Sequence, residues 1–135
     1  MKVDLEMLDD QIFTILVDYV KEHLDDPELD DSNFSTRKST PSDSELPFVY
    51  LKRINGIEFA NDLEAVDLHG GLYTYEVRVT SNVSQDEVST IMNEVTKAMK
   101  SMAFVATSLP IYLDTDNLHI KAARWQREFD DEDTI

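Results

Sequence analysis

The chain has 135 residues, which fits one domain large enough to bury a core of its own. Its formal net charge is -16, from 28 Asp and Glu against 12 Lys and Arg, and this excess of acid argues strongly against a protein that grips nucleic acid by neutralising phosphates. The absence of cysteine excludes disulfides and thiolate metal sites.

The first element in chain order is an expected helix over residues 5–24. Its acidic start suits the positive end of a helix dipole, and its apolar residues recur every three or four positions. The expected inner face consists of Leu5, Leu8, Ile12, Ile15, Leu16, Tyr19 and Val20. Residues 25–46 follow as a long acidic loop, rich in Asp, Ser, Thr and Pro and without clear periodicity. A structureless loop of this length is usually functional or mobile.

Two strands are predicted next, over residues 48–54 and 72–80. The first is closed by Asn55-Gly56, a dipeptide that readily takes positive φ. The second alternates, so that one face is buried and carries Tyr73, Tyr75, Val77 and Val79. The connection over residues 57–71 is too long for a tight hairpin. Its apolar residues could form a third short strand or pin the loop to the core, and both interpretations stay open: Phe59, Leu63, Val66 and Leu68.

A second helix is predicted to open at Ser84, because Ser84 and Glu87 have the spacing of a capping box. An apolar stripe follows at a helical period and predicts that this helix packs on the sheet: Val88, Ile91, Met92, Val95, Met99 and Met102. The three methionines could line an adaptable binding groove, but core filling is the commoner reason for such spacing. We therefore expect them in the core.

The C-terminal part is predicted as a long hairpin, with strands over residues 103–113 and 117–129 around the turn 114–117. Pro110 lacks a backbone donor, so its strand should lie at a sheet edge or bend there. Residues 130–135 begin with a block of like charge and are predicted to be a disordered acidic tail.

These elements predict an α+β fold, in a single domain over residues 1–129. It should have a mostly antiparallel sheet of about four to five strands with two helices on one face, in the order α-β-β-α-β-β. No apolar run is long enough to cross a membrane, and no secretion or lipidation signal is recognisable. We expect a soluble protein without a membrane role.

No residues form a recognisable catalytic, cofactor or metal site. His23, His69 and His119 fall in no metal-binding spacing, and the acids of residues 25–33 lack the EF-hand pattern. No serine belongs to a nucleophile motif, and three glycines cannot supply a phosphate loop or a dinucleotide fingerprint. The expectation is a protein that is not an enzyme and holds no cofactor or metal.

Three stretches nevertheless carry a resemblance. FVYLKRINGIEFANDLE at residues 48–64, YTYEVRVTSN at 73–82, and the Ser84 helix ending in MKSMAF at 99–104 resemble the small tail-terminator, or tail-completion, proteins of long-tailed bacteriophages. The match covers most of residues 47–129, and the order of elements agrees with that family. The acidic loop 25–46 and the tail 130–135 lie outside it.

The resemblance implies a structural virion protein of the tail and neck that assembles in the host cytoplasm. Such a protein caps the tail tube at its final length, closes into a ring that is commonly hexameric, and joins the tube to the head connector. Its partners would be copies of itself, the tail tube protein and the head completion or connector protein. DNA would pass through without specific binding, and no reaction would be catalysed.

The subunit contacts of such a ring would be head to tail. We expect them on the C-terminal hairpin and the 57–71 connection, where apolar side chains look poorly enclosed. The candidate interaction residues are Asn55, Phe59, Asn61, Asp62, Leu63, Trp125 and Phe129. For Phe59 and Trp125 a place in the monomer core is an equal or better interpretation.

The acidity has two interpretations under this hypothesis. An acid-lined lumen would repel phosphates over about 8 Å at physiological salt, or the charge only keeps an assembly-prone subunit in solution. A different function is an acidic inhibitor that mimics DNA or binds a basic partner. Mimicry predicts a fixed acidic face, whereas the predicted sheet carries basic residues: Lys52, Arg53, Arg78, Lys121, Arg124 and Arg127.

Overall fold

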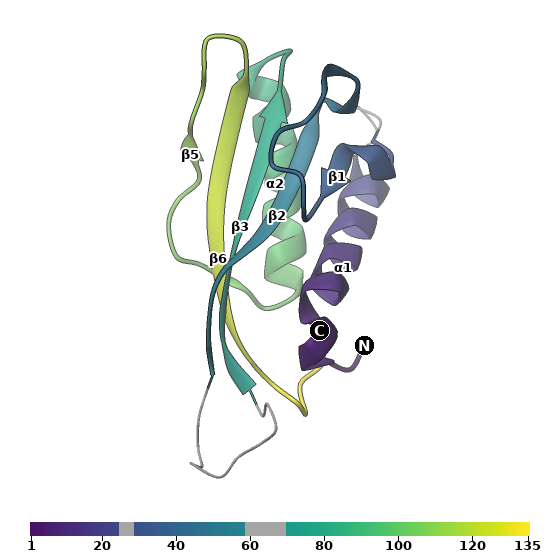
Figure 1. The fold of residues 1–135 in the computed structure, drawn as a ribbon, viewed down its shortest axis with the longest axis vertical. Helices are drawn as coiled ribbons and strands as arrows, with labels where there is room; N and C mark the ends of the chain where they lie inside the picture. The colour runs from purple at the N-terminus through teal and green to yellow at the C-terminus, as the bar shows by residue number, and fades with distance from the viewer. Residues whose placement is uncertain (25–28, 59–69) are drawn as a thin grey trace.

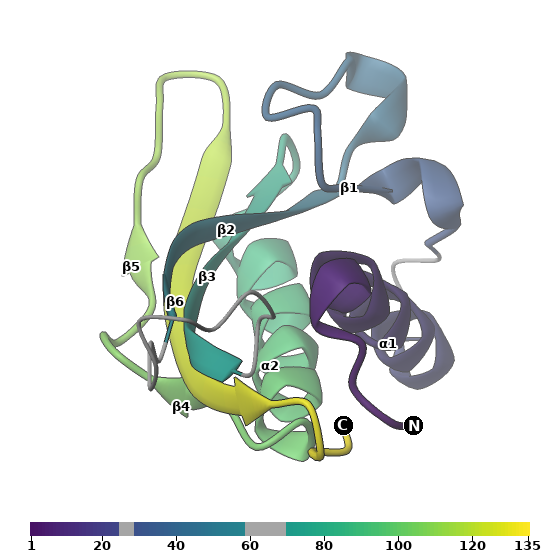
Figure 2. The ribbon, with the colours of Figure 1, turned by 60° about the horizontal axis from the view of Figure 1, so that its bottom comes forward.

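Two helices and a six-stranded sheet form the fold, which is seen in a computed structural model that describes residues 1–24, 29–58 and 70–135. The helices are α1 (Leu8–His23), preceded by a 3₁₀ turn at Leu5–Met7, and α2 (Gln85–Ser101). The strands are β1 (Phe34–Ser35), β2 (Phe48–Glu58), β3 (Gly70–Ser81), β4 (Val105–Ala106), β5 (Ile111–Tyr112) and β6 (His119–Asp130). Both helices lie on the same side of the sheet (Figures 1 and 2), so the fold class is α+β.

The sheet is mixed and differs in detail from the prediction. Its order is β1-β2-β3-β6-β4, with β5 also paired to β6. The β1 strand runs parallel to β2, and all other pairs are antiparallel. The predicted order lacked β1, because a strand of two residues has no periodicity to detect. The predicted strand over 103–113 is in fact two short strands that pair separately with β6.

The β2 strand is longer than predicted. It passes through Asn55 and Gly56, which pair with Thr74 and Tyr73 of β3, so the prediction that this dipeptide closes the strand is wrong. The register shifts between Arg53 and Asn55, as it does at a β-bulge. Pairing with the whole length of β3 outweighs the local preference of Asn-Gly for a turn. The two interpretations of the connection after β2 concern residues 59–69, which lie outside the described residues.

The core lies between the inner face of the sheet and the two helices. The predicted alternation of β3 is confirmed, since Tyr73 is 5% exposed and Tyr75, Val77 and Val79 are fully buried. The stripe of α2 faces these residues, and its methionines belong to the core. On α1 the predicted inner face is buried at Leu8, Ile12, Leu16 and Val20, while Ile15 and Tyr19 pack at its margin.

The start of α2 has the predicted cap. The Ser84 side chain accepts a hydrogen bond from the Glu87 backbone N–H at 3.1 Å. The return half of the capping box is replaced by another contact, because the Glu87 carboxylate accepts from the Ser81 hydroxyl at 2.7 Å. The helix start is thereby tied to the end of β3.

Replacing Ser84 with alanine is expected to lower the free energy of unfolding by about 1 kcal/mol, because one amide donor of the first turn loses its acceptor. Chemical denaturation measures the change. Ser39→Ala is the matched control, since Ser39 is exposed in a loop, and it should change the free energy by less than about 0.5 kcal/mol. Equal values for the two variants would contradict the role of Ser84 as the cap.

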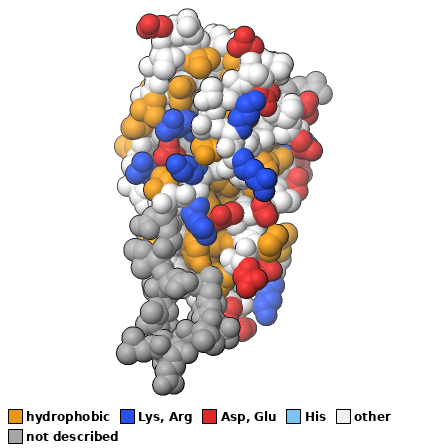
Figure 3. All heavy atoms as spheres, viewed as in Figure 1, with side chains coloured by type: hydrophobic (Ala, Val, Ile, Leu, Met, Phe, Trp, Pro, Cys, Tyr) orange, Lys and Arg blue, Asp and Glu red, His pale blue; other side chains and the backbone are white. Residues whose placement is uncertain are grey.

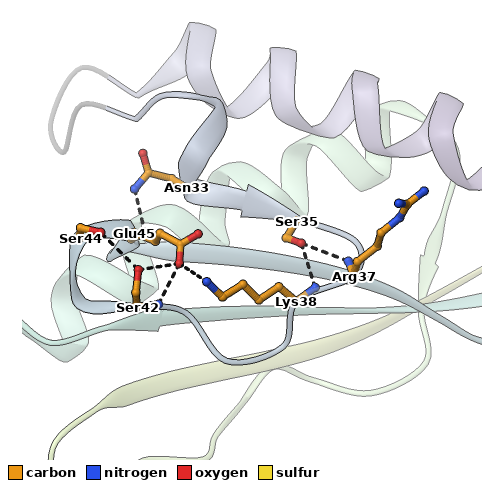
Figure 4. A network of polar contacts seen from close by, with 7 residues as sticks. All are labelled: Asn33, Ser35, Arg37, Lys38, Ser42, Ser44 and Glu45. Atoms are coloured by element: carbon orange, nitrogen blue, oxygen red, sulfur yellow. Dashed lines mark hydrogen bonds and ion pairs between the residues drawn. The ribbon is translucent and has the colours of Figure 1, made fainter.

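Residues 29–46, the described part of the expected long loop, contain short local elements. Two 3₁₀ turns, Asp31–Asn33 and Asp43–Glu45, each carry a capping box. The Asn33 side chain donates to the carbonyl oxygens of Glu45 and Pro47 at 3.0 and 2.9 Å, which ties the two turns together (Figure 4). Polar side chains here satisfy the backbone in place of a regular element.

Glu45 is the centre of this network. Its carboxylate accepts from the Lys38 ammonium at 2.6 Å and from the Ser42 backbone N–H and hydroxyl at 2.9 and 2.7 Å (Figure 4). The hydrogen bond from Lys38, followed by those from Ser42, lowers the pKa of Glu45 from 4.5 to about 2. The stabilisation from this carboxylate is therefore complete above pH 4.5 and is lost as the pH falls through about 2.

Titration of the Glu45 side-chain carboxyl, followed by NMR, should show a midpoint near pH 2. In Lys38→Met the midpoint should rise toward 4.5, because the largest cause of the lowered pKa is removed. Asp43→Asn is the control, because it removes a neighbouring carboxylate without touching these hydrogen bonds. A midpoint near the ordinary value in the unaltered protein would contradict the network.

The acidic tail is ordered, which corrects the prediction of disorder. The Val3 N–H donates to the Asp133 carbonyl oxygen and the Ile135 N–H donates to that of Met1, both at 2.9 Å. The Arg127 guanidinium donates to the Thr134 carbonyl oxygen at 2.9 Å, and Ile135 packs against the core. The two ends of the chain therefore lie side by side (Figures 1 and 2).

Candidate interaction surface

The candidate interaction residues fall into three groups. Trp125 and Phe129 are each 1% exposed and belong to the core, so the expectation that they are poorly enclosed is wrong, and the core interpretation holds for them. They point inward because the register places Trp125 opposite the fully buried Tyr75 of β3, and Phe129, four residues further along β6, lies on the same face. Asn55 lies in β2 opposite Thr74. Four candidates lie outside the described residues: Phe59, Asn61, Asp62 and Leu63.

An exposed apolar segment lies instead at residues 105–113, which we call the apolar edge segment. Val105, Leu109 and Ile111 are 69%, 82% and 56% exposed, and Tyr112 and Leu113 are also exposed. The short strands of this segment pair with β6 beyond β3, and Pro110 lies between them outside any strand, so the predicted strand is interrupted there. The sequence gives no signal of this exposure, because a continuous apolar run such as residues 109–113 is equally typical of a buried strand.

The side of the sheet that faces away from the helices, the outer sheet face, continues from this segment. The registers place Tyr50, Arg78, Ala122 and Ile111 in one cross-strand row, since Tyr50 pairs with Arg78, Arg78 with Ala122 and Ala122 with Ile111. The next row contains Lys52, Glu76 and Arg124. Among the described residues, no helix or strand covers these rows (Figures 1 and 2).

The outer sheet face is locally basic in a chain that is strongly acidic. The Arg78 guanidinium contacts the Glu76 carboxylate at 2.9 Å, and the Arg124 guanidinium contacts it at 3.4 Å. Lys52 pairs with Glu76 in the register and is exposed. Two arginines thus contact one carboxylate and Lys52 lies on the strand beside it, and Figure 3 shows Lys and Arg side chains gathered around an acidic one on this face. The excess of positive charge favours an anionic partner.

The opposite side of the molecule is acidic. Asp10, Asp18 and Glu22 are exposed on α1 at spacings of eight and four residues, which places them along one side of the helix. We call them the acidic side of α1. A hollow of about 340 Å³ lies next to them, between α1 and the segment that leads into β1. It is lined by Phe13, Thr14, Val17, Asp18, Asp31 and Phe34.

A polar contact inside the fold joins α1 to the sheet. The Tyr75 hydroxyl donates to the Asp9 carboxylate at 2.5 Å, and Arg53 lies 3.7 Å from the same carboxylate. Burial, followed by the hydrogen bond to Asp9, raises the pKa of Tyr75. The phenol therefore stays protonated at neutral pH and acts as a donor that positions α1, with a hollow of about 280 Å³ beside it.

The described residues contain no group of three His, Cys, Asp or Glu side chains that could hold a metal ion. In the same part of the chain, no helix is long and apolar enough to span a membrane. Comparison with protein-family models gives no match, and comparison with curated proteins gives none either. The apolar edge segment and the outer sheet face together form the candidate interaction surface.

Proposed function

We propose that this protein is a structural virion subunit that caps the tail tube of a long-tailed phage and joins it to the head connector, as a ring of copies. The proposal takes its identity from the resemblance of residues 47–129 to tail-terminator proteins. The observation that carries it is the apolar edge segment, because a strongly charged chain exposes several large apolar side chains at one edge of its sheet. Contiguous exposed apolar surface of this kind marks a protein contact.

The position of the segment supports association of copies. It lies at one end of the strand order, whereas the outer edge of β2 at the other end is covered by β1 only at Val49 and Tyr50. A contact that joins different surfaces of two copies is heterologous, and it closes into a ring when the rotation per copy permits. A subunit of this form acts by shape and needs no reactive group.

The double variant Leu109→Asp/Ile111→Asp is expected to abolish the ring, because two desolvated apolar contacts become buried carboxylates. Negative-stain images of the protein mixed with polymerised tail tube protein should show capped tubes for the unaltered chain and bare tubes for the variant. The matched control is Met7→Asp, since Met7 is 51% exposed and lies at the start of α1, which packs on the other side of the sheet. It should cap tubes normally.

Two results would overturn the proposal. One is a monomer that leaves tail tubes bare at every concentration. The other is normal capping by the Leu109→Asp/Ile111→Asp variant. A monomer that binds a basic DNA-binding protein and is displaced by duplex DNA would favour the alternative function, an acidic inhibitor.

A further inference from the structure

We infer that neighbouring copies are held by charge pairing between two unlike faces: the basic residues of the outer sheet face on one copy dock against the acidic side of α1 on the next. The inference rests on the proposed function, because it names the partner surfaces of that ring. It commits to a second copy of this chain as the occupant of the outer sheet face.

The net charge favours such pairing. Two chains of formal charge -16 repel each other at long range, and salt screens this repulsion beyond about 8 Å at physiological ionic strength. At the contact itself only the local charges act. A contact that places a basic region of one copy against an acidic region of the other is therefore favoured, because like charges placed face to face are strongly unfavourable.

The outer sheet face is the region that meets this need. Lys52, Arg78 and Arg124 lie close together on adjacent strands, with Glu76 between them as an internal counter-charge. The side chains of Arg78 and Arg124 are 41% and 55% exposed, so their guanidinium groups retain free donors. Ile111 of the apolar edge segment lies in the same row as Arg78. Apolar and basic groups therefore form one continuous surface (Figure 3).

The acidic side of α1 has the complementary chemistry. Its Asp10, Asp18 and Glu22 carry three negative charges, while the one lysine of the helix, Lys21, is already held by Asp31 at 2.7 Å. The adjacent hollow is apolar at Phe13, Val17 and Phe34 and acidic at Asp18 and Asp31. An arginine fits this combination, because its methylene stem and planar guanidinium pack on aromatic rings while its donors reach carboxylates.

The two faces lie on opposite sides of one molecule, because α1 packs on the inner side of the sheet (Figure 2). Each copy therefore offers a basic face to one neighbour and an acidic face to the other. This arrangement excludes a closed two-fold pair that uses the same surface twice, and it leads to a ring or a filament.

Complementary charge reversals test the pairing. In the sheet variant, Lys52→Glu/Arg124→Glu, the basic face becomes acidic while the contact of Arg78 with Glu76 is kept. In the helix variant, Asp10→Lys/Asp18→Lys, the acidic side of α1 becomes basic. Each variant alone is expected to self-associate at least about tenfold more weakly than the unaltered chain. Light scattering coupled to size exclusion measures the assembly, and thermal unfolding shows that each monomer is folded.

An equal mixture of the two variants is the decisive sample. In an alternating assembly every contact joins opposite charges again, so the mixture is expected to assemble as strongly as the unaltered chain. Lys97→Glu/Lys100→Glu is the matched control for the sheet variant, because it makes the same change in net charge as that variant, on exposed residues of α2. It should assemble normally.

Three results would overturn the inference. These are normal assembly of the sheet variant and of the helix variant when each is alone, a mixture of the two that stays dissociated, or a control on α2 whose self-association is weakened as much as theirs. Binding of duplex DNA to the unaltered chain but not to the sheet variant would also overturn it, since the outer sheet face would then be a binding site for DNA phosphates. In each of these cases the proposed function would still hold if the unaltered chain caps tail tubes. If the unaltered chain leaves the tubes bare, both the proposed function and the inferred charge pairing would be wrong.

Discussion

Replacement of Trp125 by alanine is expected to lower the free energy of unfolding by about 3 to 5 kcal/mol. The indole is 1% exposed and lies opposite Tyr75 in the pairing of β6 with β3. Its removal leaves a cavity between the sheet and the helices, because neighbouring strands fixed by backbone hydrogen bonds relax only in part. Denaturant unfolding at constant pH measures the loss.

Two controls separate burial from contact with another molecule. Trp125→Phe keeps most of the buried apolar volume and should cost clearly less than Trp125→Ala. Val105→Ala truncates an exposed side chain and should change the free energy of unfolding by less than about 0.5 kcal/mol. If Trp125→Ala weakened assembly while leaving monomer stability unchanged, its place in the core would be wrong.

Deletion of residues 131–135 is expected to destabilise the fold by about 2 to 4 kcal/mol. The deletion removes the partners of Val3, Met1 and Arg127 and the packing of Ile135 on the core. Each lost hydrogen bond contributes about 0.5 to 1.5 kcal/mol, and the buried part of Ile135 adds to them. A disordered tail, as predicted from the sequence, would instead be removable with no loss of stability.

The control for this deletion is Glu132→Gln, which removes one tail charge at an exposed position and keeps the backbone contacts. Its free energy of unfolding should match that of the unaltered chain within about 0.5 kcal/mol. Hydrogen exchange offers a second measurement, because the Val3 amide should lose its protection in the truncated chain. Equal stability of the truncated and full chains would show that the tail does not hold the N-terminal segment.

Periodic elements were predictable from the sequence. The pattern of β3 repeats at the period of a strand, with Tyr73, Tyr75, Val77 and Val79 on one face, and the stripe of α2 repeats at the period of a helix. One sequence is therefore enough to predict both elements. Ser84 could be placed because a cap is a local contact between residues three positions apart.

Elements held by distant partners were not predictable. The β1 strand exists because Phe34 and Ser35 pair with Val49 and Tyr50. Asn55 and Gly56 stay in β2 because the long β3 strand continues beside them. The tail looked disordered because four acidic residues stand in sequence, whereas its order comes from backbone contacts with the N-terminal segment. None of these contacts leaves a periodic trace in the sequence.

The candidate surface was missed for a related reason. Trp125 and Phe129 were chosen by residue type, but type does not tell which face of β6 a residue occupies until its register with β3 is known. The same register brings Lys52, Arg78 and Arg124, which are far apart in the sequence, around Glu76. A surface formed across three strands can be seen only in the folded sheet.

The strand order also determines when this fold can form during translation. The β6 strand lies between β3 and the short strands β4 and β5, although it follows all of them in the chain. A nascent chain that has not yet delivered residues 119–130 leaves one edge of β3 and the partners of Trp125 open to water. Such a chain presents unpaired strand edges that chaperones bind. Synthesis of β6, and not emergence of the first helix, therefore sets the moment at which the sheet can be completed.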